Sequence, residues 1–428
     1  MSRSKPLILS AALTGAKYAP WLKDVNGKSL PVKANFLARF MPITPEQVEA
    51  DAVEAYDAGA RFIHVHARNP KTGEQFADLE WYQDVTERLH TRCPGAVISY
   101  PTSRKGEVQD QIESALAELA ARQGNPPNTT QRALIEAQIR AVALEARPDT
   151  LTSFTVPEVR MFGTPKNTKG VEEVPGWTDT NVMQAYYKNV IGKARQLGVK
   201  QEIEITTLSQ FEAVQQLVDK PSFGLEGPVH IVILPGFSAG FPITRQAYET
   251  ALRQIDIFRE RSGLPVTVTC GIAIRPEDAR NYANFSEPGK HDYKEVLEWI
   301  AEDNRVDVFR AGVEDTPVLY GDHTSNGGLI RHIAGLCRKK GIKVETDIET
   351  VRRQFGLDGH HKVPEHQFRI NTASNKMPMA GDRTEAKKIQ RELTLMHERK
   401  PFTDRDGLFL TSEPPIRVLG VSETSVPL

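Results

Sequence analysis

Two histidines separated by one residue are the first candidates for chemistry in this chain. His64 and His66 stand at the end of the apolar run RFIHVH. In a β-strand, the side chains of residues i and i+2 point to the same face, so both imidazoles would project together. Such a pair supplies half of a zinc site. The pair alone fits two hydrogen-bonded structural histidines equally well, so a metal site requires a third ligand.

The run FRAGVED, at residues 309–315, offers that third ligand. If this run is a strand that continues to its end, Arg310, Gly312 and Glu314 share one face. Glu314 would then complete a set of two histidines and one glutamate. Three protein ligands leave one coordination position open, which is the catalytic arrangement. Zinc fits these ligands best, although metal supply and site geometry could admit another divalent ion.

The elements that must position these residues are eight short, β-branched runs separated by helical stretches. Most runs are almost continuously apolar, as expected for parallel strands that are covered on both faces. Eight βα units predict a (β/α)8 TIM barrel, and its active sites lie at the C-terminal ends of the strands. The runs are Leu7–Ala11, Arg61–His66, Ala96–Tyr100, Thr150–Phe154, Glu202–Thr206, His230–Leu234, Pro265–Cys270 and Val306–Arg310. The first helical stretch is opened by Thr44-Pro45-Glu46 and ends at Gly59. Further helical stretches are Leu79–Cys93, Asn181–Leu197, Ser209–Asp219, Thr244–Ser262, Tyr293–Glu302 and Asn326–Lys340.

Two regions exceed a minimal barrel. Residues 107–147 hold two helical stretches around the break GNPPNTT, and a further helical stretch is expected near Glu385–Arg399. We therefore assign residues 1–345 to a catalytic barrel with an insert at 107–147. Residues 346–428 form a C-terminal extension, which is expected to pack on the barrel or on a neighbouring subunit.

Composition limits the classes of partner. The chain has 54 basic and 55 acidic side chains, a net charge of -1, which argues against nucleic acid or an anionic membrane as a partner. No run of about 18 apolar residues predicts a membrane span. Cys93, Cys270 and Cys337 are odd in number and far apart, so we expect no disulfide framework and a reduced, cytoplasmic setting.

Several sequence blocks resemble the β-keto acid cleavage enzymes, a family that includes 3-keto-5-aminohexanoate cleavage enzyme. The blocks are LILSAALTGA, PITPEQVEADAVEAYDAGARFIHVHARNPKTGE and FRAGVED, with weaker matches at RPDTLTSF, EIEI and HIVILPG. The resemblance covers most of residues 7–345. It implies a TIM barrel with one Zn2+ per chain, commonly assembled as a homotetramer. It also implies that a β-keto acid and acetyl-CoA are converted to acetoacetate and a new CoA thioester.

The resemblance assigns roles to five residues of the two motifs. His64, His66 and Glu314 match the zinc ligands of the family, and Arg310 and Asp315 match its catalytic arginine and aspartate. Asp315 would act as the base that removes the proton next to the keto group. Arg310 would orient that base and stabilise developing negative charge. An ordinary ion pair at a strand end is the alternative for these last two residues.

The stretch after the third strand departs from the family pattern. Where the family often has a Ser-Thr-Gly-Gly turn that holds the substrate carboxylate, this chain reads Pro101-Thr102-Ser103-Arg104. With proline at the serine position, carboxylate binding is expected to pass to Thr102, Ser103 or the guanidinium of Arg104.

Lys17 is a second departure, and it bears on the choice of substrate. The aminohexanoate-cleaving members carry a glutamate at this place, facing the substrate amine, and a lysine would repel an ammonium group. We therefore predict that the substrate is not the 5-amino compound and has an anionic or neutral polar distal group. Lys17 pointing to solvent is the alternative. Thr152 matches a threonine of the family that contacts the substrate.

Two other functions compete with this interpretation. A zinc-dependent hydrolase on a TIM barrel is the first, but such enzymes often carry the HxH pair on the first strand and further ligands on strands four to six. Here the pair falls on the second strand, and the fifth, EIEIT, has no histidine. The second alternative is a non-catalytic barrel, which Pro101 favours and which Arg310 and Asp315 oppose. Dependence on acetyl-CoA separates all three.

Overall fold

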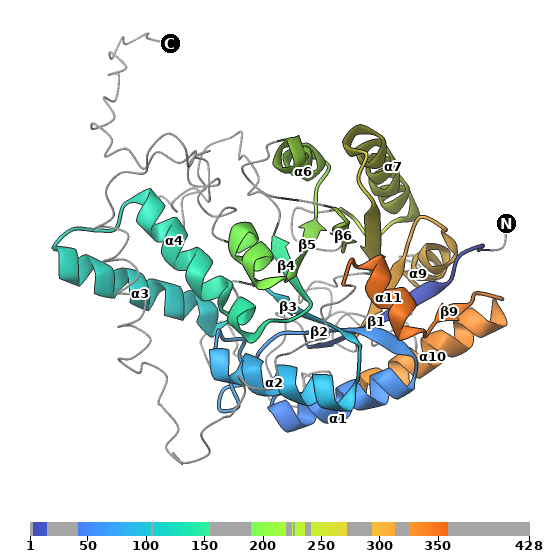
Figure 1. The fold of residues 1–428 in the computed structure, drawn as a ribbon, viewed down its shortest axis with the longest axis horizontal. Coiled ribbons are helices and arrows are strands. Elements are labelled where there is room, and N and C mark those ends of the chain that lie inside the picture. The colour runs from blue at the N-terminus through green and yellow to red at the C-terminus, as the bar shows by residue number, and fades with distance from the viewer. Residues whose placement is uncertain are drawn as a thin grey trace, which may run out of the picture. The chain divides into compact units, whose positions relative to one another are not determined.

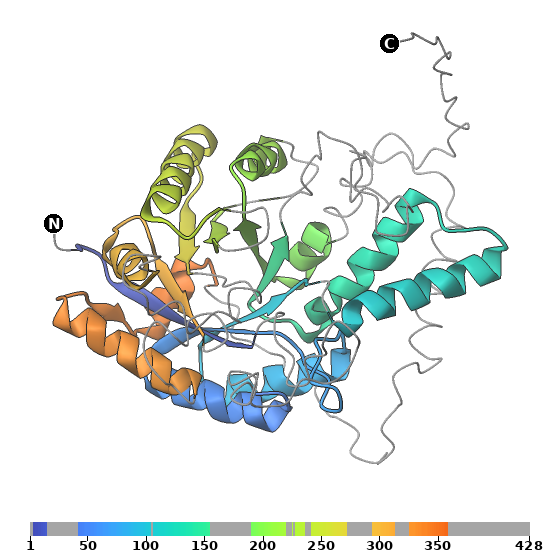
Figure 2. The same ribbon diagram turned by 180° about the vertical axis from the view of Figure 1, so that it is seen from behind.

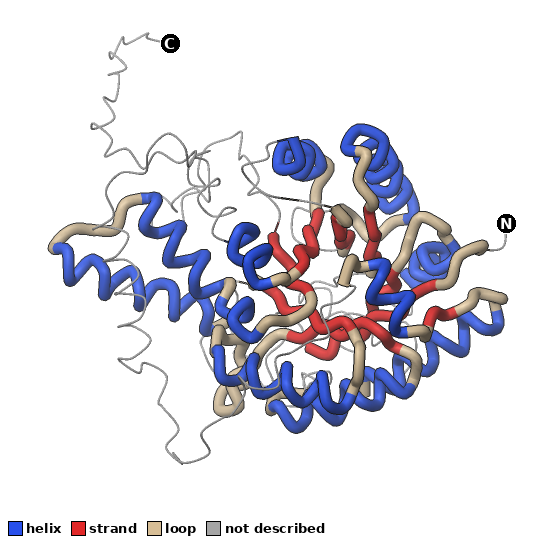
Figure 3. Tube along the Cα trace, viewed as in Figure 1, coloured by secondary structure: helices blue, strands red, loops and turns tan. Residues whose placement is uncertain are grey.

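Eight parallel strands close into a barrel that helices surround (Figure 3). The computed structural model describes residues 3–14, 42–103, 106–154, 190–219, 225, 227–235, 241–271, 293–312 and 325–357. Strands β1 to β8 pair in sequence order, and β1 also pairs with both β2 and β8, which closes the ring. The predicted (β/α)8 class is confirmed. Within these ranges, no helix combines the length and the apolar character that crossing a membrane would require.

The barrel strands and the helices between them follow the predicted order (Figure 1). The strands are β1 (Leu7–Thr14), β2 (Ala60–Val65), β3 (Val97–Pro101), β4 (Thr150–Phe154), β5 (Lys200–Ile205), β6 (Val229–Ile233), β7 (Val266–Cys270) and β8 (Val308–Ala311). The helices are α1 (Pro45–Asp57), α2 (Leu79–Arg92), α3 (Glu107–Gln123), α4 (Thr129–Arg140), η3 (Val142–Ala146), α6 (Ser209–Asp219), α7 (Arg245–Ser262), α9 (Tyr293–Glu302), α10 (Asn326–Lys339) and α11 (Ile348–Gln354). A two-residue strand, β9 (Val344–Glu345), pairs with the start of β1.

Side-chain alternation on the strands explains how the barrel is filled. Leu9, Ile63 and Ile231 point outward and join the large core between strands and helices. Their neighbours in sequence point into the barrel. The outer helices begin at local signals, as α1 does where Thr44 and Gln47 form a capping box. Burial of each outward Leu or Ile contributes roughly 1.5–3 kcal/mol, so this outer core stabilises the frame that carries the inward residues.

The N-terminal ends of the strands are covered by α11 and the residues after it, which we call the closed end. The rings of Phe62 and Phe355 lie 5.1 Å apart. Arg352 donates to the buried Asp149 at 2.9 Å, and this ion pair ties α11 to the start of β4. Sequence analysis did not identify α11. The apolar cluster of the closed end comprises Ile8, Phe62, Val97, Val308, Val351, Phe355 and Leu357.

Residues 107–147, predicted to be an insert, form two helices that lie side by side, α3 and α4 (Figures 1 and 2). The short helix η3 follows them. The break between the two helices begins at Gly124, which ends α3 in a left-handed conformation, and Asn128 caps α4. The two predicted helical stretches are therefore present. The helical stretch expected near Glu385–Arg399 lies outside the described residues.

Candidate active site

The interior of the barrel changes from apolar to polar along the same strands. On β2, Phe62 belongs to the closed end, and His64, two residues further, is polar and buried. The same step leads from Val97 to Ser99 on β3, and β1 and β8 change in the same way. The polar layer comprises Ser10, His64, Ser99, Thr150, Thr152, Glu202 and Arg310, all less than 9% exposed. Buried polar groups need partners, so the contacts of this layer indicate what it can do.

His64 is held by a hydrogen-bonded chain that runs across three strands. Its Nδ1 lies 2.9 Å from Ser99 Oγ. The Ser99 hydroxyl donates to Glu202 Oε1 at 2.5 Å, so its oxygen accepts from His64 Nδ1–H. Thr150 donates to the same carboxylate oxygen. With Glu202 ionised, this hydrogen-bonded network favours the Nδ1–H tautomer of His64, with the lone pair of the ring on Nε2.

His66 lies just past the end of β2 and is held from the loop that follows. Its Nδ1 lies 3.0 Å from Gln75 Oε1. A carbonyl oxygen only accepts, so His66 also carries its proton on Nδ1 and its lone pair on Nε2. The two imidazole rings lie 5.1 Å apart, between centroids.

Both histidines therefore fit a metal site, because metal-ligating histidines usually donate their second ring N–H to a neighbouring oxygen. The predicted third ligand, Glu314, lies outside the described residues. Across the described ranges, no group of three His, Cys, Asp or Glu side chains is placed to hold an ion. A metal bound by these two histidines would therefore take its third protein ligand from outside the described residues.

Electrostatics favour neutral imidazole at this place. Burial lowers the pKa of His64 well below its ordinary value, and the charge of Arg310 and the neighbouring His66 lower it further. Burial raises the pKa of Glu202, against the hydrogen bonds from Ser99 and Thr150 that lower it. Arg310 is 7% exposed, and among the described residues its Nε has no hydrogen-bond partner. The layer thus combines a metal-competent histidine with a buried positive charge.

The predicted substrate residues lie partly within the described structure. Thr102 and Ser103 are buried at the end of β3, and Thr152 stands on β4, with its Oγ1 3.4 Å from Ser99 Oγ. The hydroxyl of Thr102 donates to the Thr152 carbonyl at 3.0 Å, so its single proton is already committed. Lys17, Arg104 and Asp315 lie outside the described residues.

Sequence reasoning missed three residues that hold the histidines. Ser99 and Glu202 are polar residues at inward positions of apolar strands, and that pattern in AVISY and EIEIT could have identified them. Gln75 lies in a loop, and nothing in the sequence pattern relates it to His66.

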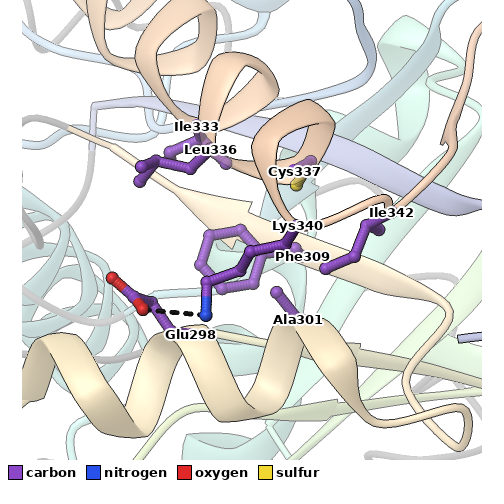
Figure 4. Close-up of a pocket in the computed structure, with 8 residues that line it drawn as sticks. All are labelled: Glu298, Ala301, Phe309, Ile333, Leu336, Cys337, Lys340 and Ile342. Carbon is purple, nitrogen blue, oxygen red and sulfur yellow. Dashed lines mark ion pairs between the residues drawn. The ribbon is translucent and has the colours of Figure 1, made fainter. Parts of the chain in front are cut away.

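A shallow pocket elsewhere shows a different chemistry (Figure 4). It lies on the outer side of β8, between α9 and α10, and Phe309, Ile333 and Leu336 are among its lining residues. Glu298 and Lys340, its charged groups, pair with each other at 3.0 Å. Its lining includes the thiol of Cys337, but burial raises the pKa of this thiol to about 11, so it is not an ionised nucleophile at neutral pH.

Comparison with known proteins decides the family. The family model described as beta-keto acid cleavage enzyme matches residues 30–269, more than half of the chain. The chain belongs to the β-keto acid cleavage enzyme family. The resemblance inferred from the sequence blocks is thereby confirmed.

Three curated relatives carry differing names. It is 30% identical over 108 residues to a 3-dehydrocarnitine:acetyl-CoA trimethylamine transferase of Rhizobium meliloti, covering 25% of this chain and 31% of that protein. It is 29% identical over 102 residues to a 3,5-dioxohexanoate:acetyl-CoA acetone transferase of Paraburkholderia graminis (24% and 28%). It is 30% identical over 96 residues to a 3-keto-5-aminohexanoate cleavage enzyme of Fusobacterium nucleatum (22% and 29%). The matched region thus spans less than a third of each relative's length.

Proposed function

We propose that the protein is a zinc-dependent β-keto acid cleavage enzyme that uses acetyl-CoA as co-substrate. The observation that carries the proposal is the pair His64 and His66, each held in the Nδ1–H form at the mouth of a barrel from this family. Both rings then present Nε2 for coordination, and Glu314 supplies the third ligand. Two relatives named as acetyl-CoA transferases support the choice of co-substrate.

The reaction exchanges two acyl groups between the sulfur of CoA and the carbon next to the substrate carboxylate. Asp315 removes a proton from the carbon between the keto group and the carboxylate, and Arg310 orients that base and stabilises the developing enolate. The chemistry that zinc supplies in such a site is Lewis-acid polarisation of the keto oxygen. The enolate carbon attacks the carbonyl of acetyl-CoA, and the CoA thiolate moves to the former keto carbon. Cleavage of the original carbon–carbon bond releases the new thioester and the enolate of acetoacetate, which takes back a proton from Asp315.

The substrate carboxylate binds at the end of β3. The Arg104 guanidinium is its main donor, beside Thr102 and Ser103, and Thr102 is also held by its bonds to Thr152. Lys17 selects a distal group that is neutral or anionic, so the 5-amino compound is a poor substrate. The enzyme works in the cytoplasm as a homo-oligomer, a tetramer by analogy with the family.

The test is an assay of acetoacetate and new CoA thioester with the zinc-loaded protein. Acetyl-CoA is supplied with β-keto acids whose distal groups are cationic, neutral or anionic. We expect one group of substrates to give both products, and Glu314→Gln to lose roughly a hundredfold or more of the activity. A product that forms equally well without acetyl-CoA would indicate the zinc-dependent hydrolase instead. A 5-amino substrate that outperforms every anionic one would overturn the role of Lys17.

A further inference from the structure

The loop that follows His66 is folded back on itself. Phe76 donates its backbone N–H to the Ala67 carbonyl at 3.2 Å, and Arg68 and Gln75 form an antiparallel bridge. This return brings Gln75, nine residues along the chain, to the imidazole of His66. The position of Gln75 therefore depends on whatever holds residues 67–78 in place.

The first turn of α3 contacts this loop through the backbone. Glu107 N–H donates to the Gln75 carbonyl at 2.8 Å. Gly106, with φ of 66°, precedes it, and a Cβ at Gly106 would stand only 2.6 Å from the same carbonyl oxygen. No larger residue permits this approach without moving the loop. The start of the insert is thus fitted against the backbone of Gln75.

Side chains of α3 form hydrogen bonds with the loop on both sides of Gln75. The Glu107 carboxylate accepts from Asn69 Nδ2 at 2.8 Å and from Thr72 Oγ1 at 2.5 Å. The Gln111 side-chain amide pairs with both the N–H and the carbonyl of Ala77, each at 2.9 Å. Hydrogen bonds to α3 thus restrain the loop along its length, from Asn69 to Ala77.

The second helix of the insert contacts the end of β3 in a similar way. Arg140 Nε donates to the Thr102 carbonyl at 2.7 Å, and its Nη1 pairs with Glu136 at 2.6 Å. Both side chains of this ion pair are nearly buried, at 8% and 11% exposure. The two helices therefore reach two neighbouring loops of the same barrel mouth.

We propose that the insert is a positioning element of the active site, in which α3 fixes the loop so that Gln75 orients His66 for metal binding. This inference rests on the zinc-dependent function proposed above. Gln75 is a positioning residue for His66, and Glu107 acts one step further out. The matched control is Glu118, on the same helix, with a side chain 55% exposed and only a 3.9 Å ion pair with Arg122.

Zinc affinity of the full-length protein is the first readout, measured by competition with a chromophoric chelator. We expect Gln75→Ala to weaken zinc binding about 10- to 100-fold, because second contacts of ligating histidines commonly have effects of this size. Gln75→Glu keeps an acceptor at the same place and restores affinity to within about threefold of wild type. Glu107→Ala weakens binding roughly three- to tenfold, and Glu118→Ala leaves it unchanged. Circular dichroism shows whether each variant remains folded.

The tautomer of His66 is the second readout and needs no metal. Nitrogen-15 spectra of histidine-labelled, zinc-free protein report the protonated ring nitrogen, and His66→Gln identifies the signal. We expect the Nδ1–H form in wild type and in Glu118→Ala, and a mixture of tautomers in Gln75→Ala. An unchanged tautomer together with a zinc affinity within about twofold of wild type in folded Gln75→Ala would overturn the proposal. If wild type itself bound no zinc, the proposed function would fail, and the tautomer alone would decide the positioning role.

Discussion

The two ends of the barrel interior are built from the same strands but contain opposite chemistry. The closed end is apolar and tightly packed, with Phe62 and Phe355 at its centre. The polar layer lies two residues further along β2, β3 and β8, where His64, Ser99 and Arg310 are buried. A step of two residues is only about 6.6 Å, so packing and chemistry are separated by a single layer of side chains.

This contrast indicates that the inward residues of the closed end mainly stabilise the fold, while those of the polar layer mainly serve the active site. Residues of the closed end contact α11 and contribute burial, while residues of the polar layer hold one another through hydrogen bonds. If the separation holds, a change at one end should leave the property of the other end nearly unaffected. Three variants test this, from the largest expected effect to the smallest.

Truncation at the closed end should reduce stability and spare zinc binding. Phe355→Ala removes the ring that packs on Phe62 and His230, and a cavity of this kind costs about 3–5 kcal/mol. Urea unfolding of the zinc-free protein measures the loss. Leu208→Ala, at a side chain 45% exposed, is the control and should change stability little. Removing a direct partner of a metal ligand typically lowers metal affinity about tenfold or more. A loss of zinc affinity of that size in folded Phe355→Ala would contradict the separation of the two ends.

A change in the polar layer should weaken zinc binding and have little effect on stability. Ser99→Ala removes the oxygen that accepts from His64 Nδ1–H, and we expect zinc affinity to fall about 10- to 100-fold with a stability loss of only about 1 kcal/mol. Ser10→Ala is a close control, because Ser10 also lies buried in the layer and, within the described structure, its hydroxyl has no hydrogen-bond partner. Equal zinc affinities in the two variants would remove Ser99 from the site.

His230 offers a third test, because its burial should make the stability of the closed end depend on pH. It belongs to the closed end, where its Nε2 donates to the Phe355 carbonyl at 3.2 Å, and burial lowers its pKa to about 3. In the unfolded chain His230 binds a proton near pH 6.5, whereas in the folded chain it stays neutral at this pH. The contribution of neutral His230 to the free energy of unfolding is therefore fully present above about pH 6.5. It should fall by up to about 1.4 kcal/mol per pH unit as pH decreases toward 3. Unfolding measured from pH 7.5 to 5 should show a shallower fall for His230→Gln, and parallel curves would contradict this assignment.

The sequence predicted the frame of the molecule because its signals are local. Apolar runs such as RFIHVH and the helix start Thr44-Pro45-Glu46 specify strands and helices without reference to distant residues. The same alternation placed His64 and His66 on one face. It could not predict Gln75, because the contact with His66 depends on a loop return and on α3. Nor could it predict α11, which is a seven-residue helix whose role arises only where Phe355 meets strands from the other half of the chain.

Covering the closed end with α11 has a consequence for how the chain is made. Phe62 leaves the ribosome early, and Phe355, which packs on it, follows 293 positions later. At the usual rate of synthesis this interval lasts roughly 15–60 s. During that time the apolar starts of β1, β2 and β3 lack the residues that cover them in the finished barrel. We therefore expect nascent chains of this length to be clients of chaperones, and release to follow the emergence of α11.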